Sequence, residues 1–142
     1  MSSKAPTGYP SIDKPWLKFY SEKALSTPIS PCGMYDFMYN NNKDKPENTA
    51  LNYFGKKMSY GEFFAEIDKT AKAFVACGVK PGDVVTLITL SCVPSVICLY
   101  ALNKIGAVSV MIHPLSAENE LVHYAEDCDA DFAITVDDIY PN

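Results

Sequence analysis

Glycine is scarce and scattered in this sequence, with seven residues at positions 8, 33, 55, 61, 78, 82 and 106. No G-x-G-x-x-G or G-x-x-x-x-G-K-[ST] motif can be drawn through them, so no glycine-rich loop is available to cradle nucleotide phosphates. A G-x-S-x-G motif is also missing, which excludes the nucleophile elbow of α/β-hydrolases. The sequence therefore lacks the usual marks of phosphate binding and of serine hydrolysis.

Clusters of basic residues are missing as well. The 142 residues include 12 basic and 17 acidic side chains, which gives a formal net charge of −5. Because nothing in the sequence builds a stripe of lysine or arginine, nucleic acid and anionic lipid are poor candidates for partners.

The cysteines do not form a recognisable framework. Their number is odd and no two of them have C-x-x-C spacing; they are Cys32, Cys77, Cys92, Cys98 and Cys128. Cys77, Cys92 and Cys98 lie within or beside apolar segments, so we expect buried free thiols in a reducing compartment rather than disulfides. The first sixteen residues contain no apolar core of a secretory signal, and we predict a cytoplasmic location.

One long uncharged run, Val84–Asn103, allows two interpretations. It is nearly long enough to span a membrane. However, polar residues interrupt it, and Ser91 and Pro94 are typical of a helix start. We favour a buried strand followed by a buried helix, with membrane insertion as the alternative.

Residues 1–32 are predicted to form an N-terminal arm and linker. An aromatic segment with Trp16, Phe19 and Tyr20 could form one or two turns of amphipathic helix. These side chains could line a ligand groove, but packing of the arm onto the following domain is their more ordinary role. The prolines of Thr27–Pro31 indicate a linker.

Residues 33–142 are predicted to form an α/β unit that begins with a short helix and a hairpin. Residues 33–41 have apolar side chains at helical spacing. The run Thr49–Phe54 is typical of a strand, and Gly55 marks a tight turn into Lys57–Ser59. Together these two segments predict a β-hairpin.

The best-specified helix follows Ser59. Ser59 and Glu62 fit a capping box, and Gly78 suits the position after the helix end, where positive φ carries no Cβ penalty. The predicted apolar face, with residues at 3.6-residue spacing, consists of Phe63, Phe64, Ile67, Ala71, Phe74 and Val75.

Strands and helices then alternate. We predict strands at 84–89, 108–112 and 131–136. We predict one helix at about 92–105 and a second helix that is capped by Ser116 and extends to about Asp127. In the last helix Leu121, Tyr124, Ala125 and Cys128 are expected to face inward. Because single helices join the strands, the strands should pair in parallel with right-handed crossovers. The predicted fold class is α/β: an open, mostly parallel sheet with helices on both faces, preceded by a β-hairpin.

His113 is the best single candidate for a functional side chain. It lies just beyond a predicted parallel strand, where open α/β sheets often place ligands. We favour a loop histidine ahead of Pro114, because the sequence identifies no carboxylate or nucleophile partner. His123 is interpreted as a solvated helix residue, and two histidines ten residues apart do not supply a zinc site.

The alternating acids Asp127, Asp129 and Asp131 are similar to the start of a calcium loop. Such a loop needs Gly at its sixth position and Glu at its twelfth, but these positions hold Phe132 and Asp138. We therefore interpret the acids as a solvated turn and assign no metal-binding residue.

The stretch Thr49–Asp138 resembles the opening segment of the adenylate-forming enzymes, which include acyl-CoA synthetases and peptide-synthetase adenylation domains. The resemblance is carried, in order, by Met58–Tyr60, Cys77–Val85, Ala101–Val108, Ile112–Leu115 and Glu120–Tyr124. The segment Pro15–Tyr20 is similar to the leader of fatty acyl-CoA synthetases. The resemblance covers about ninety residues and identifies residues 33–142 as the truncated N-terminal α/β part of an AMP-binding domain.

The resemblance implies a parent acid–thiol ligase that activates a carboxylic, in our expectation fatty, acid with ATP and Mg²⁺ and passes it to coenzyme A. The family's phosphate loop, ribose-binding acid, adenine-binding residues and C-terminal lysine have no counterpart in this sequence. We therefore assign no catalytic or cofactor-binding residue and expect an inactive scaffold. Its expected partner is the remainder of its own polypeptide, and an exposed apolar flank should favour self-association. The alternative is a free-standing flavodoxin-like binding or interaction module.

Overall fold

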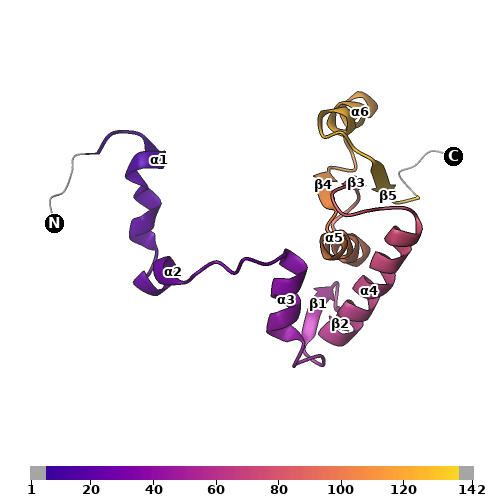
Figure 1. The fold of residues 1–142 in the computed structure, drawn as a ribbon, viewed down its shortest axis with the longest axis horizontal. Helices are drawn as coiled ribbons and strands as arrows, with labels where there is room; N and C mark the ends of the chain where they lie inside the picture. Colours follow the sequence, from indigo (N-terminus) through magenta and orange to yellow (C-terminus); the bar gives the residue numbers. More distant parts are fainter. Residues whose placement is uncertain (1–5, 138–142) are drawn as a thin grey trace. The chain divides into compact units, whose positions relative to one another are not determined.

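The computed structural model describes residues 6–137, and the chain divides into two units between Pro31 and Cys32. The first unit contains α1 (Pro10–Asp13), the 3₁₀ helix η1 (Pro15–Phe19) and α2 (Glu22–Ser26) (Figure 1). No side chain of these three short helices is buried. Trp16, Phe19 and Tyr20 are exposed.

The second unit begins with a helix and a hairpin, α3 (Met34–Asn42), β1 (Thr49–Tyr53) and β2 (Lys56–Ser59). Phe54 and Gly55 at the hairpin tip have φ values of 47° and 87°. Positive φ at both central residues is typical of a type I′ turn, whose twist matches that of paired strands. The Asn52 side chain accepts a hydrogen bond from Gly55 N at 3.1 Å. The predicted hairpin is confirmed.

The helix α4 (Tyr60–Ala76) starts as predicted. Glu62 N donates to the Ser59 hydroxyl at 3.3 Å, and Ser59 N donates to the Glu62 carboxylate at 2.8 Å. The Ser59 hydroxyl also donates to this carboxylate, at 2.9 Å. The donation from the Ser59 N–H, and after it the donation from the hydroxyl, hold the pKa of Glu62 below its usual value. Gly78 follows the helix with φ 99°.

The remaining elements form an α/β sheet (Figure 1). Its strands run in parallel in the order β4-β3-β5, and α5 and α6 lie on opposite sides of them. The predicted fold class is confirmed. The bounds are β3 (Val84–Ile88), α5 (Val93–Ile105), β4 (Val108–Ile112), α6 (Glu118–Asp127) and β5 (Phe132–Thr135).

The central strand β3 is buried on both faces. Val85 and Leu87 are 0% exposed and belong to the cluster formed with α5. Thr86, which points to the other face because side chains alternate along a strand, is 1% exposed. This burial explains the nearly continuous apolar run at 84–88.

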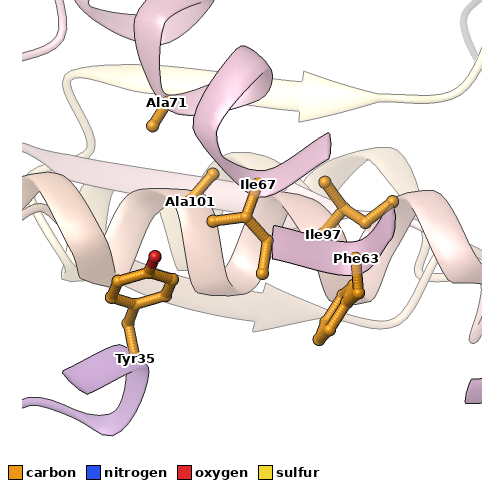
Figure 2. Close-up of a cluster of buried hydrophobic side chains, with 6 residues drawn as sticks. All are labelled: Tyr35, Phe63, Ile67, Ala71, Ile97 and Ala101. Atoms are coloured by element: carbon orange, nitrogen blue, oxygen red, sulfur yellow. The ribbon is translucent and has the colours of Figure 1, made fainter. Parts of the chain in front are cut away.

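Helix α5 contributes to two hydrophobic clusters. In the first, Ile97 and Ala101 pack against Tyr35 of α3 and a line of α4 residues made of Phe63, Ile67 and Ala71 (Figure 2). In the second, Leu102 packs against β3. The uncharged run is therefore a buried strand and a buried helix, as favoured. Within residues 6–137, no helix has both the length and the apolar character that crossing a membrane requires.

In both later helices, the N-cap is the residue after the serine that suggested the helix start. Cys92 is the N-cap of α5, and the buried Ser95 hydroxyl donates to Leu90 O at 2.6 Å. Ala117 is the N-cap of α6, so the prediction of Ser116 as cap is wrong. Ala117 has no side-chain acceptor, but its N–H donates to the Glu120 carboxylate at 3.0 Å. Half of a capping box is therefore enough to set this boundary.

Three predicted burial states are also wrong. Tyr124 on α6 is 42% exposed, because α6 places no residue in either buried cluster. Val75 is exposed in the last turn of α4, where the neighbouring Phe74 rather than Val75 packs against both clusters. Cys77 is exposed because it is the C-cap of α4 rather than part of its apolar face.

We expect Ser59→Ala to lower the free energy of unfolding by about 1 kcal/mol, because it removes the acceptor for an orphan helix N–H. Urea denaturation at neutral pH measures the change. The matched control is Ser116→Ala, which should change stability by less than about 0.5 kcal/mol because Ser116 caps no helix. An equal loss in both variants would contradict the assigned helix starts.

The variant Ala117→Ser should raise the free energy of unfolding by about 0.5–1 kcal/mol, because a hydroxyl at the N-cap completes the capping box that Glu120 already half forms. The same denaturation experiment measures it. Ala117→Val, which offers no acceptor, serves as the control and should not stabilise. No gain with serine would show that α6 begins elsewhere.

Candidate functional site

The carboxyl ends of β3 and β4 form the candidate site. Ile88 pairs with Ile112 at the ends of these strands, so the following residues, Thr89 and His113, lie at the same edge of the sheet. The loops after these two strands lead to helices on opposite faces (Figure 1). Open α/β sheets bind ligands at such a point.

His113 is exposed and is held by its own turn. Its Nδ1 accepts a hydrogen bond from Leu115 N at 3.2 Å, and its carbonyl accepts one from Ser116 N at 3.1 Å. This arrangement fixes the ring and leaves Nε2 for another partner. His113 can therefore orient or hydrogen-bond a ligand.

The fold brings polar side chains near His113, a proximity that the sequence did not predict. A hollow of about 330 Å³ between β4 and α6 is lined by His113 together with Ser116, Tyr124, Asp127 and Cys128, among others. Within the described part of the chain, no hydrogen bond joins the His113 ring to Ser116, Asp127 or Cys128. The residue types of nucleophilic catalysis are gathered here without the geometry that activates a nucleophile.

Thr89 was not singled out by the sequence. It is 9% exposed, and its hydroxyl is buried without a hydrogen-bond partner among residues 6–137. A buried hydroxyl without a partner costs about 1–3 kcal/mol, so its presence at a strand end is unusual. Thr89 is, like Thr86, a threonine within an apolar run, and no sequence pattern distinguishes it as a candidate.

The other sequence candidates have structural or solvent-exposed positions. Asp131 closes β5 onto β3: its carboxylate accepts from Val84 N at 2.8 Å, and its N–H donates to Val84 O at 2.9 Å. Asp129 has φ 50°, in the left-handed region of the turn before β5. Within residues 6–137, no group of three or more His, Cys, Asp or Glu side chains is placed to hold a metal ion. His123 is exposed on α6.

A second polar cluster joins α3, α4 and α5. The Lys104 ammonium forms an ion pair with Asp68, donates to the Tyr35 hydroxyl at 2.9 Å and lies 4.5 Å from the Tyr35 ring centroid. Asn103 accepts from Tyr35 N at 2.8 Å. Burial lowers the pKa of Lys104, but the bonds to Asp68 and Tyr35 outweigh it and raise the pKa above its usual value. The lysine is therefore a cationic tie between helices, with its charge already paired.

Cysteine reactivity tests the environment of α5. Burial, and to a smaller extent the neighbouring Cys92, raise the pKa of the half-buried Cys98 thiol. Because the thiolate is the reactive form, we expect iodoacetamide at pH 8 to alkylate the exposed Cys77 at least about tenfold faster than Cys98. Peptide mass spectrometry over time measures both rates. Equal rates in the folded chain, as expected in urea, would contradict the packing of α5.

Comparisons with known proteins agree on one family. The family model described as AMP-binding enzyme matches residues 38–141. The chain is 28% identical over 130 residues to the long-chain-fatty-acid–CoA ligase of Bacillus subtilis. This alignment covers 90% of the chain and 23% of the ligase. It is 37% identical over 86 residues to the crotonobetaine/carnitine–CoA ligase of Proteus mirabilis, covering 61% of the chain and 17% of the ligase.

The fold is also shared with a solved structure. The N-terminal subdomain of Klebsiella oxytoca NpsA, in complex with 3-hydroxybenzoyl-AMSN, superposes with a TM-score of 0.72 at 24% identity. The match covers 78% of this chain and 28% of that one. The chain thus spans only about a fifth of the length of the ligases it matches.

Proposed function

Because the chain belongs to the AMP-binding enzyme family, we propose that it is the N-terminal scaffold of an ATP-dependent acid–CoA ligase. The observation that carries this proposal is the family match over residues 38–141, supported by similarity to two CoA ligases. We favour it over a flavodoxin-like binding module because that alternative does not account for the family match.

The proposed reaction of the complete enzyme has two steps. A substrate carboxylate attacks the α-phosphorus of ATP, which releases pyrophosphate and leaves an acyl-adenylate. The thiol of coenzyme A then attacks the acyl carbon and releases AMP. Mg²⁺ would neutralise phosphate charge in the first step. The developing charge requires positioned donors and cations, and the edge near His113 and Thr89 supplies few of them. We therefore propose that this segment supports the reaction without performing it.

We propose a fatty acid as the substrate of the complete enzyme. The longest of the reported similarities, over 130 residues, is to a long-chain-fatty-acid–CoA ligase.

A cytoplasmic location is part of the proposal. It is supported by the free thiols Cys77, Cys92, Cys98 and Cys128, since reduced cysteines are typical of that compartment.

The proposed partner is the remainder of the same polypeptide. The edge strand β4 exposes Val108 to 52% and Met111 to 57%, and Leu90 and Leu115 near its end are 55% and 82% exposed. An exposed apolar edge of this kind is a site for association. By itself, the 142-residue chain is therefore proposed to self-associate.

ATP–pyrophosphate exchange tests the proposal. We expect the 142-residue chain to remain at background, because it lacks a phosphate loop, whereas the polypeptide encoded by the complete reading frame should form AMP and an acyl-CoA from fatty acids. Omission of coenzyme A should stop acyl-CoA formation but leave exchange. Exchange by the short chain, or a complete reading frame that encodes no phosphate loop, would refute the assignment.

A further inference from the structure

The tip of the β-hairpin carries an exposed pair of aromatic rings, Tyr53 and Phe54, which we call the aromatic tip. Phe54 is 93% exposed, more than any other large apolar side chain in the described part of the second unit. Its ring lies at 77° to the Tyr53 ring, with the two centroids 4.6 Å apart, and Tyr53 is 42% exposed. Every residue in the range 52–57 is exposed.

The turn does not require an aromatic residue at position 54. The φ of Phe54 is 47°, in the left-handed region that bulky side chains rarely adopt. Type I′ turns form most readily with Asn-Gly or Asp-Gly, so asparagine would suit this position better. Residues held in such backbone conformations cluster at functional sites. Neither the turn nor the hydrophobic core accounts for Phe54, so its ring is available to a partner.

Two lysines follow the aromatic tip and lie on opposite faces of the hairpin. Tyr53 pairs with Lys56 and Asn52 pairs with Lys57, and side chains alternate between faces along a strand. Lys56 therefore shares a face with Tyr53, whereas Lys57 lies on the other face. Neither lysine forms an ion pair in the described part of the chain. One available ammonium group thus flanks the aromatic tip on each face.

Two acidic side chains of α4 line a hollow together with these lysines, but both have other partners. Glu62 accepts from the N–H and the hydroxyl of Ser59, at the end of β2 away from the tip. Glu66 lies 3.7 Å from the Lys69 ammonium. The sequence has no acidic residue in the range 48–61. The hairpin is therefore locally cationic in a chain whose formal net charge is −5.

We propose that the aromatic tip inserts into the surface of an anionic lipid bilayer, with Lys56 and Lys57 at the lipid phosphates on either side of it. Aromatic rings favour the membrane–water interface. Lysine stems lie along apolar surface while their ammonium groups stay at the polar level. The acidic remainder of the chain is repelled by the same surface, which orients the hairpin toward it.

The geometry favours a lipid surface over nucleic acid. Single strands bind in a cationic groove that carries stacking rings, and lysines on opposite faces of a hairpin do not line one groove. An anionic surface reaches both lysines when the tip enters it end-on. The sequence has no stripe of basic residues, but the hairpin joins two lysines and two rings at one point. The proposal concerns this surface and does not rest on the proposed ligase activity.

Vesicle flotation with the 142-residue chain tests the proposal. Partitioning onto vesicles of phosphatidylglycerol and phosphatidylcholine in equal parts should be at least about tenfold stronger than onto phosphatidylcholine alone, because each lysine is attracted by an anionic surface. Salt should weaken the partitioning by screening this attraction. No binding to the mixed vesicles, or equal binding to both kinds, would overturn the proposal.

A substitution at the tip tests where the chain binds. Phe54→Asn should weaken partitioning at least about fivefold, because it removes a ring that leaves water on insertion. Since asparagine suits the turn, the melting temperature should stay equal or rise, so the lost binding cannot reflect unfolding. The matched control is Phe19→Asn, which removes a ring of 79% exposure outside the hairpin and should leave partitioning unchanged.

The lysines are tested in the same assay. Lys56→Gln with Lys57→Gln should weaken partitioning onto the mixed vesicles about tenfold at low salt. The control, Lys43→Gln with Lys45→Gln, removes the same charge ahead of β1, at the end away from the tip, and should have a smaller effect. Equal losses in the hairpin variants and their controls would refute the hairpin as the site.

Tryptophan quenching reports insertion directly. Trp16 is the only tryptophan in the sequence, so Phe54→Trp combined with Trp16→Phe places a single indole at the tip. Bromine-labelled acyl chains should quench this indole and should leave Trp16 of the original chain unquenched. The opposite pattern would show that the N-terminal arm binds the membrane instead, and would overturn the proposal.

Other occupants of the tip would be recognised in the same experiments, and each would overturn the proposal. A single-stranded oligonucleotide that binds more tightly than vesicles, and loses affinity with the same variants, would assign the tip to nucleic acid. Self-association that Phe54→Asn abolishes, without vesicle binding, would assign it to a second copy. Vesicle binding should persist in the polypeptide encoded by the complete reading frame. Binding by the short chain alone would identify the rest of the polypeptide as the occupant.

Discussion

Burial of helix α5 on two sides is the constraint on which the rest of the second unit depends. Ile97 and Ala101 pack against α4 (Figure 2). Leu102 packs against the residues of β3. Ala101 is 0% exposed, and its small side chain allows the helices to approach closely. Because α5 packs against both, its position fixes α4 on one side and the parallel strands on the other. An uncharged sequence is required for both contacts.

Polar groups in this unit are used mainly to hold elements in place. Ser59 and Glu62 fix the start of α4, Asp131 joins β5 to β3, and Lys104 ties Tyr35 of α3 to the helix pair. The Ser59–Glu62 pair satisfies N–H groups that the helix end would otherwise leave unpaired. Side chains with this use are not available for chemistry, which agrees with a scaffold role.

The sheet edge near His113 has a different character. Its histidine is exposed and held by a turn, Thr89 has a buried hydroxyl without a partner in the described residues, and the adjoining hollow contains Asp127 and Cys128. These groups can contact a ligand but do not form an activated set. Membership of the AMP-binding family fits this incomplete edge, because the chain covers a small part of each ligase it resembles.

The sequence by itself determined the features that arise within a few residues. The capping box of α4, the hairpin turn at Gly55 and the alternation of apolar strands with helices depend on contacts between near neighbours, and the structure confirms them. Tertiary structure decided the contacts between distant residues. Lys104 and Tyr35 are 69 positions apart, and only packing of α3 against α5 brings them together. Packing likewise decided that Tyr124 and Cys77 are exposed, because amphipathic spacing indicates which face is apolar but not whether another element covers it.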